Sequence, residues 1–191
     1  MTPEVFLDIL SQAGKLKTTL RHCWLEADRR ESVSDHCWRL ALMAMLLAPE
    51  PEFAETDMDR VMRMCLIHDL GESFTGDIPV FRKRDSQEHA EEDVLLKWIA
   101  GFPEPQRAEW TALLAEMTAM ETREARTYKA LDALEALISH DESDIGTWLP
   151  LERDLQLTYR QENMKVSPFF EELRACVDAW TRAKIAGSGK Y

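Results

Sequence analysis

The chain has 191 residues, of which 45% are hydrophobic and only 7 are glycine, and its formal net charge is −12. This length allows one domain with a substantial core, and the composition suits a helical protein. The negative charge argues against a nucleic-acid polymer as partner, because such binding needs a basic surface. A small phosphorylated substrate remains compatible with it, because a bound cation and one or two arginines can invert the potential locally.

Two further features concern the location of the protein. No apolar run reaches the ~20 residues that a bilayer span requires, and Met1-Thr2-Pro3-Glu4 lacks the basic start of a signal peptide. The four cysteines have neither CxxC spacing nor the density of a disulfide-rich protein, which favours reduced thiols. We therefore expect a cytoplasmic protein with no membrane partner.

The first segments are an amphipathic helix and a basic stretch. Residues 3–13 have the apolar spacing of a helix, which Gly14 closes. Residues 15–30 are rich in lysine and arginine and are predicted to be a solvated connection. Arg21 and Trp24 stand out within it, because a guanidinium near a large aromatic ring can hold a phosphate and a base or sugar.

A buried helix is predicted from Ser32 to Ala48. Ser32 and Asp35 approximate a capping box, and Arg39 is the only charged side chain in the rest of this segment. His36 lies three residues before Arg39, so the two share a helix face. A single histidine in such a place is more often a hydrogen-bonded structural residue than a metal ligand.

A second buried helix contains the apolar segment 61–70, and Thr56 with Asp59 is expected to cap it. The last turn of this helix carries His68 and Asp69. Burying a carboxylate is costly unless it is paired, hydrogen-bonded or bound to a metal. The presence of a second histidine at the end of a buried helix favours a functional site.

The segment after this helix is predicted to be a polar loop. Gly71 is a plausible helix stop, and residues 72–79 contain two further acids, Glu72 and Asp77. The basic residues 82–84 that follow are interpreted as a mobile, solvated loop, with a flank of a phosphate site as the alternative.

Five more helices are predicted in the second half of the chain, over residues 86–100, 105–120, 122–140, 151–164 and 168–186. Glu91 is interpreted as part of a solvated face, and periodicity alone makes Asp132 and Glu135 surface acids. We find no strand pattern and no second domain. The prediction is an all-α fold with one domain over residues 1–186 and a flexible tail over 187–191.

Two histidines and an aspartate on two buried helices provide nitrogen and oxygen ligands without sulfur. This donor set suits one divalent ion (Mn, Co, Ni, Fe, Zn or Mg) with open coordination positions, rather than a closed structural zinc site. One more carboxylate would give four protein ligands. The candidates are Glu72, Asp77, Asp132 and Glu135.

The spacing of these residues resembles a known pattern. His36, the His68-Asp69 pair and Asp132 are similar to the H…HD…D pattern of the HD-domain superfamily of metal-dependent phosphohydrolases. The surrounding sequence resembles the 5′-deoxynucleotidase branch of that superfamily (HD domain-containing protein 2 type) over nearly the whole chain. The matching segments are Leu16-Lys17…Arg21-x-x-Trp24, Glu31-Ser32-Val33-Ser34-Asp35-His36, His68-Asp69-Leu70-Gly71-Glu72-x-x-Thr75-Gly76-Asp77-Ile78-Pro79 and Lys129-Ala130-Leu131-Asp132-Ala133-Leu134-Glu135.

This resemblance implies a helical HD-domain bundle with a defined set of site residues. One divalent metal is held by His36, His68, Asp69 and Asp132. Glu72 and Asp77 are implied as acids that work beside the metal. Arg21 is implied to bind phosphate, and the aromatic partner that holds the sugar is Trp24 or stands at the position of His22.

The activity implied by the resemblance is a metal-dependent 5′-nucleotidase that favours deoxynucleoside monophosphates. Metal-activated water attacks the phosphorus and releases nucleoside and phosphate. Glu72 would steer or deprotonate the water, and Asp77 would contact the sugar or protonate the departing 5′ oxygen, with the two roles open to exchange. Relatives suggest a homodimer. Two alternatives stay open: an HD-type hydrolase or phosphodiesterase with another small phosphorylated substrate, and a non-catalytic helical interaction module.

Overall fold

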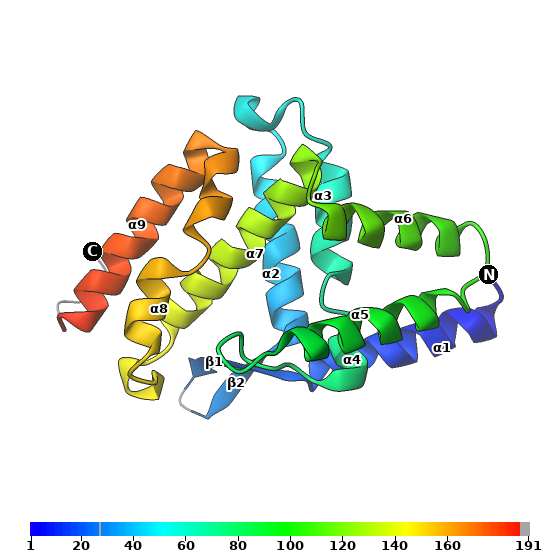
Figure 1. Cartoon of the computed structure of the whole chain (residues 1–191), viewed down its shortest axis with the longest axis horizontal. Coiled ribbons are helices and arrows are strands. Elements are labelled where there is room, and N and C mark those ends of the chain that lie inside the picture. Colours follow the sequence, from blue (N-terminus) through cyan, green and yellow to red (C-terminus); the bar gives the residue numbers. More distant parts are fainter. Residues whose placement is uncertain (27, 188–191) are drawn as a thin grey trace.

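The computed structural model describes residues 1–26 and 28–187, and regular structure in it is almost entirely helical (Figure 1). Four residues of the expected tail, 188–191, lie outside the described part. The α-helices are α1 (Pro3–Ala13), α2 (Val33–Leu47), α3 (Met58–Ile67), α4 (Glu72–Thr75), α5 (Asp85–Ile99), α6 (Gln106–Ala119), α7 (Arg123–Glu142), α8 (Glu152–Thr158) and α9 (Pro168–Ile185). Short 3₁₀ turns span Gly14–Lys17, Pro51–Phe53, Ile145–Thr147 and Gln161–Val166. The helical fold class is confirmed.

Three helices, α2, α3 and α7, form the centre of the core, with α9 packed on the other side of α7 (Figure 1). Leu40 of α2 and Leu131 of α7 are completely buried, and full burial of a leucine contributes about 1.5–3 kcal/mol. Ala44 and Ala133 are also completely buried, and their small side chains allow the helix backbones to approach one another. The core therefore consists of the helices that carry the predicted ligands.

The capping prediction for α2 is confirmed, but the one for α3 is wrong. Ser32 caps α2 in a capping box with Asp35. Helix α3 is capped by Asp57, whose carboxylate accepts the N–H of Arg60 at 3.0 Å. Asp57 stands between the two residues predicted for this role, and aspartate caps a helix as well as threonine does.

The predicted loop after α3 begins as helix. Helix α3 ends at Ile67, and i+3 hydrogen bonds such as that from the Leu70 N–H to the Ile67 carbonyl (3.1 Å) tighten the chain. The short α4 follows over Glu72–Thr75 and ends at Gly76, whose φ of 77° favours glycine. The His68-Asp69 pair therefore sits in a turn between two helices.

The prediction of no strands is also wrong. Residues 15–30 contain β1 (Leu20–Glu26), which pairs with the antiparallel β2 (Arg29–Ser32). The register shifts twice along β1, so its side chains lack the period-2 pattern that reveals a strand in sequence. A two-stranded hairpin is marginal alone, and this one is supported by packing of Cys23 against Ser139 of α7 (3.2 Å).

The predicted helix over 151–164 is divided in two. Helix α8 ends at Thr158, and a 3₁₀ turn over Gln161–Val166 follows it. Arg160 lies between them with a φ of 46°, a left-handed conformation that stops an α-helix. The break directs Tyr159 and Arg160 toward the cavity described below.

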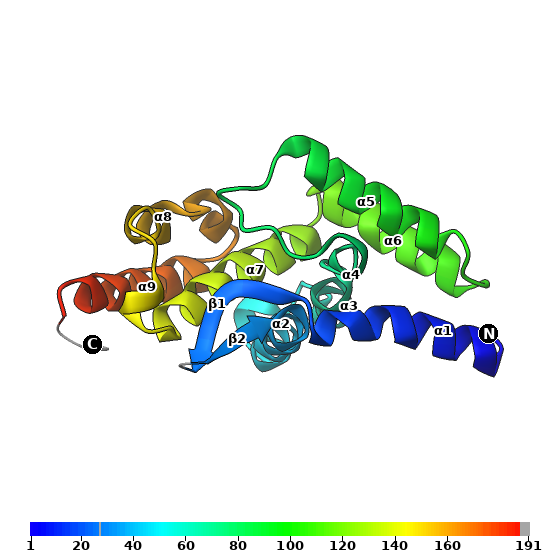
Figure 2. The ribbon, with the colours of Figure 1, turned by 90° about the horizontal axis from the view of Figure 1, so that it is seen from below.

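Viewed from below, the α5–α6 pair lies on one side of α4 and α7, and α2 with the hairpin lies on the other (Figure 2). An aromatic chain connects α4 to the pair: Phe74 contacts Trp98 at 5.7 Å between ring centroids, Trp98 contacts Phe102 at 4.8 Å, and Phe102 contacts Trp110 at 5.3 Å. Such edge-to-face pairs fix the relative position of helices. The layers enclose the cavity that holds the candidate site.

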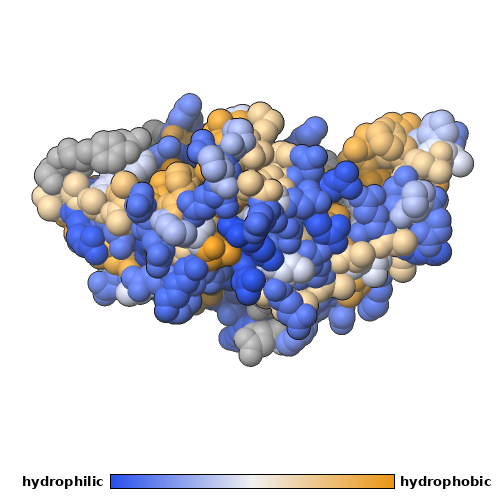
Figure 3. Space-filling view, turned by 90° about the horizontal axis from the view of Figure 1, so that it is seen from above, coloured by the Kyte–Doolittle hydropathy of each residue, from blue (hydrophilic) through white to orange (hydrophobic). Residues whose placement is uncertain are grey.

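Apolar side chains also reach the surface on the side of α1 and α2, and Figure 3 shows hydrophobic surface at the α1 end of the molecule. We call this set the α1–α2 apolar surface, and its members are Phe6, Leu7, Leu10, Trp38, Met45 and Leu46. No described helix has both the length and the apolarity needed to cross a membrane.

Candidate active site

Two buried imidazoles from different helices meet at one point. His36 is completely buried in the first turns of α2, and His68 follows the last residue of α3. Their Nε2 atoms lie 3.2 Å apart. The Nδ1–H of His68 donates to the carbonyl of Cys65 at 2.9 Å, so Nε2 is the nitrogen of His68 that faces His36 and that a cation can use.

Two aspartates complete the group, which we call the metal-binding cluster: His36, His68, Asp69 and Asp132. Asp69 Oδ2 lies 3.0 Å from His68 Nε2 and 3.8 Å from His36 Nε2. Asp132 Oδ1, from α7, lies 3.3 Å from His36 Nε2 and 3.6 Å from His68 Nε2. Atoms bound to one ion at about 2.1 Å are themselves about 3 to 3.5 Å apart.

The cluster fits a divalent cation by its chemistry as well as by these spacings. Two imidazole nitrogens and two carboxylates, with no sulfur, suit a borderline divalent ion. Burial alone would raise the pKa of Asp69, but the neighbouring His68 outweighs it and lowers that pKa far below the usual range. Lys129 and both imidazoles have the same effect on the pKa of Asp132. Both carboxylates are therefore ionised and able to bind a cation.

A second acidic group borders the cluster, and we call its members the wall acids: Glu72, Asp77 and Glu91. Ligand atoms of Asp69, Glu72 and Glu91 lie within 4.8 Å of one another. Burial, followed by repulsion from Asp69 and Asp77, raises the pKa of Glu72 to about 10. Its Oε2 is buried without a hydrogen-bond partner. Burial also raises the pKa of Asp77, which lines the cavity.

Helix α5 comes very close to the turn that carries these acids. A Cβ added at Gly71 would lie 2.6 Å from the Glu91 side chain and 3.0 Å from its carbonyl oxygen. This close approach requires glycine and corrects the interpretation of Glu91 as a solvated residue. Glu91 instead pairs with Lys83 at 2.7 Å, and Lys83 lines the cavity, so the interpretation of Lys83 as a solvated loop residue is also wrong.

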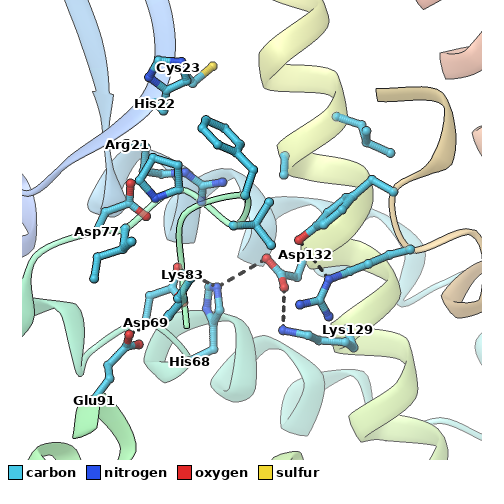
Figure 4. Close-up of a pocket in the computed structure, with 18 of the residues that line it drawn as sticks. Arg21, His22, Cys23, His68, Asp69, Asp77, Lys83, Glu91, Lys129 and Asp132 are labelled. Atoms are coloured by element: carbon cyan, nitrogen blue, oxygen red, sulfur yellow. Dashed lines mark hydrogen bonds and ion pairs between the residues drawn. The ribbon is translucent and has the colours of Figure 1, made fainter. Parts of the chain in front are cut away.

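The hairpin places Arg21 at the cavity and Trp24 outside it. Arg21 Nε lies 3.2 Å from the buried carboxylate of Glu31, and its side chain lines the cavity (Figure 4). Burial opposes its charge, but Glu135 and Glu31 outweigh that effect and raise its pKa. Trp24 is not among the lining residues, and its backbone N–H donates to Ser143 Oγ at 3.2 Å.

His22, and not Trp24, lies beside Arg21 at the cavity. Its ring lies against Phe81 at 5.8 Å between centroids, and its Nε2 is 3.3 Å from Glu152 Oε1. Both rings line the cavity. The aromatic wall beside Arg21 is therefore formed by His22 and Phe81.

The cavity has a volume of about 730 Å³ and extends from the cluster to α8. Figure 4 shows Asp132 facing His68, with Lys129 beside it and Arg21 and Asp77 across the space. Lys129 Nζ lies 2.9 Å from Asp132 Oδ2. Further lining cations are Lys83 and Arg160. Basic side chains thus line this space together with acids, which include Asp69, Asp77 and Asp132.

Two glutamates, Glu31 and Glu135, are buried behind the site, and the sequence pattern did not predict their burial. Glu31 accepts the hydroxyl of Ser139 at 2.6 Å and pairs with Arg21. Glu135 contacts His36, and periodicity made it a surface acid, whereas it is completely buried. One signal was available: Glu135 lies three residues after Asp132 and hence on the same helix face.

Comparison with known proteins places this geometry in a family. Residues 13–174 match the family described as HD domain. The human protein named 5′-deoxynucleotidase HDDC2 is 34% identical over 140 residues, which cover 71% of this chain and 67% of that protein. The Dictyostelium discoideum protein of the same name is 28% identical over 177 residues, with 88% of each chain covered.

A solved structure supports the same assignment. The crystal structure of a protein described as a predicted metal-dependent phosphohydrolase, from Magnetospirillum magnetotacticum, matches with a TM-score of 0.78 and 31% identity. The match covers 97% of this chain and 96% of that one. Because sequence and structure agree over most of its length, this chain belongs to the HD domain family.

Proposed function

We propose that the protein is a metal-dependent 5′-nucleotidase that hydrolyses nucleoside 5′-monophosphates, with a preference for deoxynucleotides. The observation that carries this proposal is the convergence of four candidate ligand side chains at one end of a cavity whose lining also includes Arg21, Lys83 and Lys129. The names of the relatives, 5′-deoxynucleotidase and metal-dependent phosphohydrolase, support the reaction class.

The metal-binding cluster would hold one divalent cation from the series Mn, Co, Ni, Fe, Zn and Mg. When bound, such a cation supplies an activated water as nucleophile and neutralises phosphate charge. The protein contributes the ionised carboxylates and the two oriented imidazoles. Since the cluster lies at the end of the cavity, a phosphate there leaves room for a nucleoside along α7.

Arg21 is proposed to bind the phosphate. Its guanidinium can form two parallel hydrogen bonds to phosphate oxygens, and Glu31 holds it in place from behind. Lys129 and Lys83 add positive charge to the same space. Phosphoryl transfer depends on positioning and electrostatics, so these cations account for much of the expected rate.

Glu72 and Asp77 are proposed as the acid and base of the reaction. The pKa of Glu72 is raised to about 10, so this group can carry a proton at neutral pH, and burial raises the pKa of Asp77. One would orient or deprotonate the water, and the other would protonate the departing 5′ oxygen. His22 is proposed to pack against the sugar together with Phe81, while the position of Trp24 supports no direct contact.

The test is a phosphate-release assay over deoxynucleoside and nucleoside 5′-monophosphates, with Mn²⁺ or Co²⁺ added. Hydrolysis of monophosphates, with dNMP above NMP, is the expected result. Turnover of a cyclic nucleotide or another phosphate ester but of no monophosphate would contradict the substrate assignment. Absence of any turnover by metal-loaded protein would favour a non-catalytic interaction module.

We further propose a homodimer in which a second copy covers the α1–α2 apolar surface. Helix α1 has no buried residue, and Leu46 of α2 is 63% exposed. Several large apolar side chains exposed on two helices favour a partner surface. Light scattering after gel filtration should give twice the monomer mass. Leu46→Glu should give a monomer, and Leu151→Glu, an exposed leucine at α8, serves as control.

Two simpler assignments accompany this function. All four cysteines are free, and Cys23, Cys37 and Cys65 are buried, which supports a reducing compartment such as the cytoplasm. Residues 1–186 are proposed to be one catalytic domain, because a single core extends from Leu16 to Val177.

A further inference from the structure

Glu135 is a completely buried carboxylate directly behind His36. It lies one helical turn after Asp132 on α7. This helix therefore carries one candidate metal ligand, Asp132, and the carboxylate that contacts a second one, His36. Glu135 Oε2 contacts His36 Nδ1, and Glu135 Oε1 accepts from Arg39 Nε at 2.7 Å. The opposite nitrogen of His36, Nε2, faces Asp132 and His68 inside the cluster.

This contact selects one form of the imidazole. A carboxylate only accepts hydrogen bonds, so a proton must lie on the Nδ1 of His36, and the lone pair of Nε2 is then free for a cation. The negative charge of Glu135 also makes the imidazole of His36 more basic and hence a stronger metal ligand. His68 is held in the same tautomer by the Cys65 carbonyl. The Nδ1 of each imidazole thus faces one hydrogen-bond acceptor: Glu135 for His36 and the Cys65 carbonyl for His68.

We propose that Glu135 is a positioning residue of the metal centre. It holds His36 in the Nδ1-protonated tautomer with Nε2 directed at the cation, and Arg39 holds Glu135. This inference rests on the proposed metal-dependent function and adds a residue that touches neither cation nor substrate.

The surroundings of Arg39 argue against a purely structural ion pair. Arg39 also pairs through Nη1 with Glu142, which is partly exposed. This arginine therefore has a carboxylate partner without Glu135. Burying a second carboxylate completely is costly unless its partners fully satisfy it, and the partner that Glu135 has and Glu142 lacks is His36.

The experiment compares Glu135→Gln with Glu142→Gln, which removes a carboxylate from the same arginine but leaves His36 untouched. Protein stripped of metal is titrated with Mn²⁺ by calorimetry, and folding is checked by circular dichroism. A glutamine must turn its NH₂ group toward either His36 or Arg39, and neither is an acceptor in the present arrangement. Glu135→Gln should weaken Mn²⁺ binding about 10–100-fold, whereas Glu142→Gln should bind like the wild type.

The outcomes separate this inference from the function on which it rests. Wild-type protein that binds no Mn²⁺ would overturn the metal centre itself. A wild type that binds, with a folded Glu135→Gln variant of equal affinity, would overturn only the role of Glu135. If that variant does not fold, ¹⁵N NMR of zinc-loaded wild-type protein decides: a proton on Nδ1 of His36 supports the proposal, and zinc bound to Nδ1 refutes it.

Discussion

The metal-binding cluster and the wall acids are neighbouring sets of buried carboxylates that behave in opposite ways. Asp69 and Asp132 face imidazoles, and Asp132 also faces Lys129, so both have a lowered pKa and stay ionised. Glu135 behind them follows the same rule: burial opposes its charge, but His36 outweighs it and lowers the pKa to about 2. These carboxylates are suited to holding cations.

Among the wall acids, Glu72 and Glu91 lie close to each other and to Asp69, and Glu91 also pairs with Lys83. Burial and then the charges of Asp69 and Asp77 raise the pKa of Glu72, and burial raises that of Glu91 although Lys83 opposes it. The difference between the sets comes from their partners and not from depth, since both are removed from solvent. We infer that one set binds the cation and the other exchanges protons, and the predictions below test that division.

The largest expected effect is in the cluster. Asp132→Asn keeps the shape of the side chain but removes the charge that both imidazoles and Lys129 face. Metal binding should be lost, and with it several kcal/mol of transition-state stabilisation, which is on the order of 10³-fold in kcat/KM. Calorimetry and phosphate release measure the two effects. The exposed Asp154→Asn is the control, and an active, metal-binding Asp132→Asn enzyme would abolish the distinction between the two sets.

Glu72→Gln should affect turnover without affecting the metal. Removing a general acid or base costs about 10²–10⁴-fold in kcat, whereas a group outside the cluster should leave Mn²⁺ affinity near that of the wild type. Steady-state kinetics and calorimetry on the same preparation separate these effects. Loss of Mn²⁺ binding in this variant would move Glu72 into the cluster.

Arg21→Lys tests whether the cation across the cavity acts through its geometry. Lysine keeps the charge that Glu31 requires but loses the planar fork that matches phosphate. We expect kcat/KM to fall by about 10–100-fold, because one or two charged hydrogen bonds are weakened. The exposed Arg29→Lys, on the same hairpin, should be neutral. Equal effects of both changes would indicate that Arg21 only supports the hairpin.

Much of this arrangement could be predicted from sequence, and the exceptions share one cause. Two buried helices with polar residues near one end predict a site at His36, His68 and Asp69. The choice of Asp132 as the fourth ligand required the resemblance to a family. Glu135 was named as a candidate ligand, but its burial against His36 was not predicted. Helical periodicity assigns charged residues to the surface, and the partner that justifies its burial is 99 residues away in the chain.

The same cause explains the other errors. Lys83 and Glu91 are solvated residues by local pattern, and only the approach of α5 to Gly71 buries them as a pair. Because the register of β1 is irregular, its sequence lacks the alternation that would predict a strand. The hairpin is supported instead by contact with α7. Local sequence therefore predicts the helices, whereas the position of the charges depends on distant segments.

The smallest expected effect extends the comparison to histidines. The carboxylates of the cluster contribute to a raised pKa of His68, despite burial, whereas burial, followed by repulsion from His22, lowers the pKa of His140 at the far wall to about 4. Below pH 6.5 the unfolded chain protonates this histidine and the folded chain does not, so stability should fall as the pH decreases toward 4. At pH 5 the loss is about 2 kcal/mol.

His140→Gln should remove this acid sensitivity. The difference in Tm between pH 7.5 and pH 5 should be smaller in the variant than in the wild type by roughly 4–8 °C, as expected for a chain of this size. Asp141, whose pKa is raised to about 6 by burial, acts in the opposite sense, but both proteins contain it and its effect cancels. An equal pH dependence of Tm in the two proteins would contradict the lowered pKa of His140. It would also mean that distance from the cluster's carboxylates does not set the pKa of a buried imidazole in this cavity.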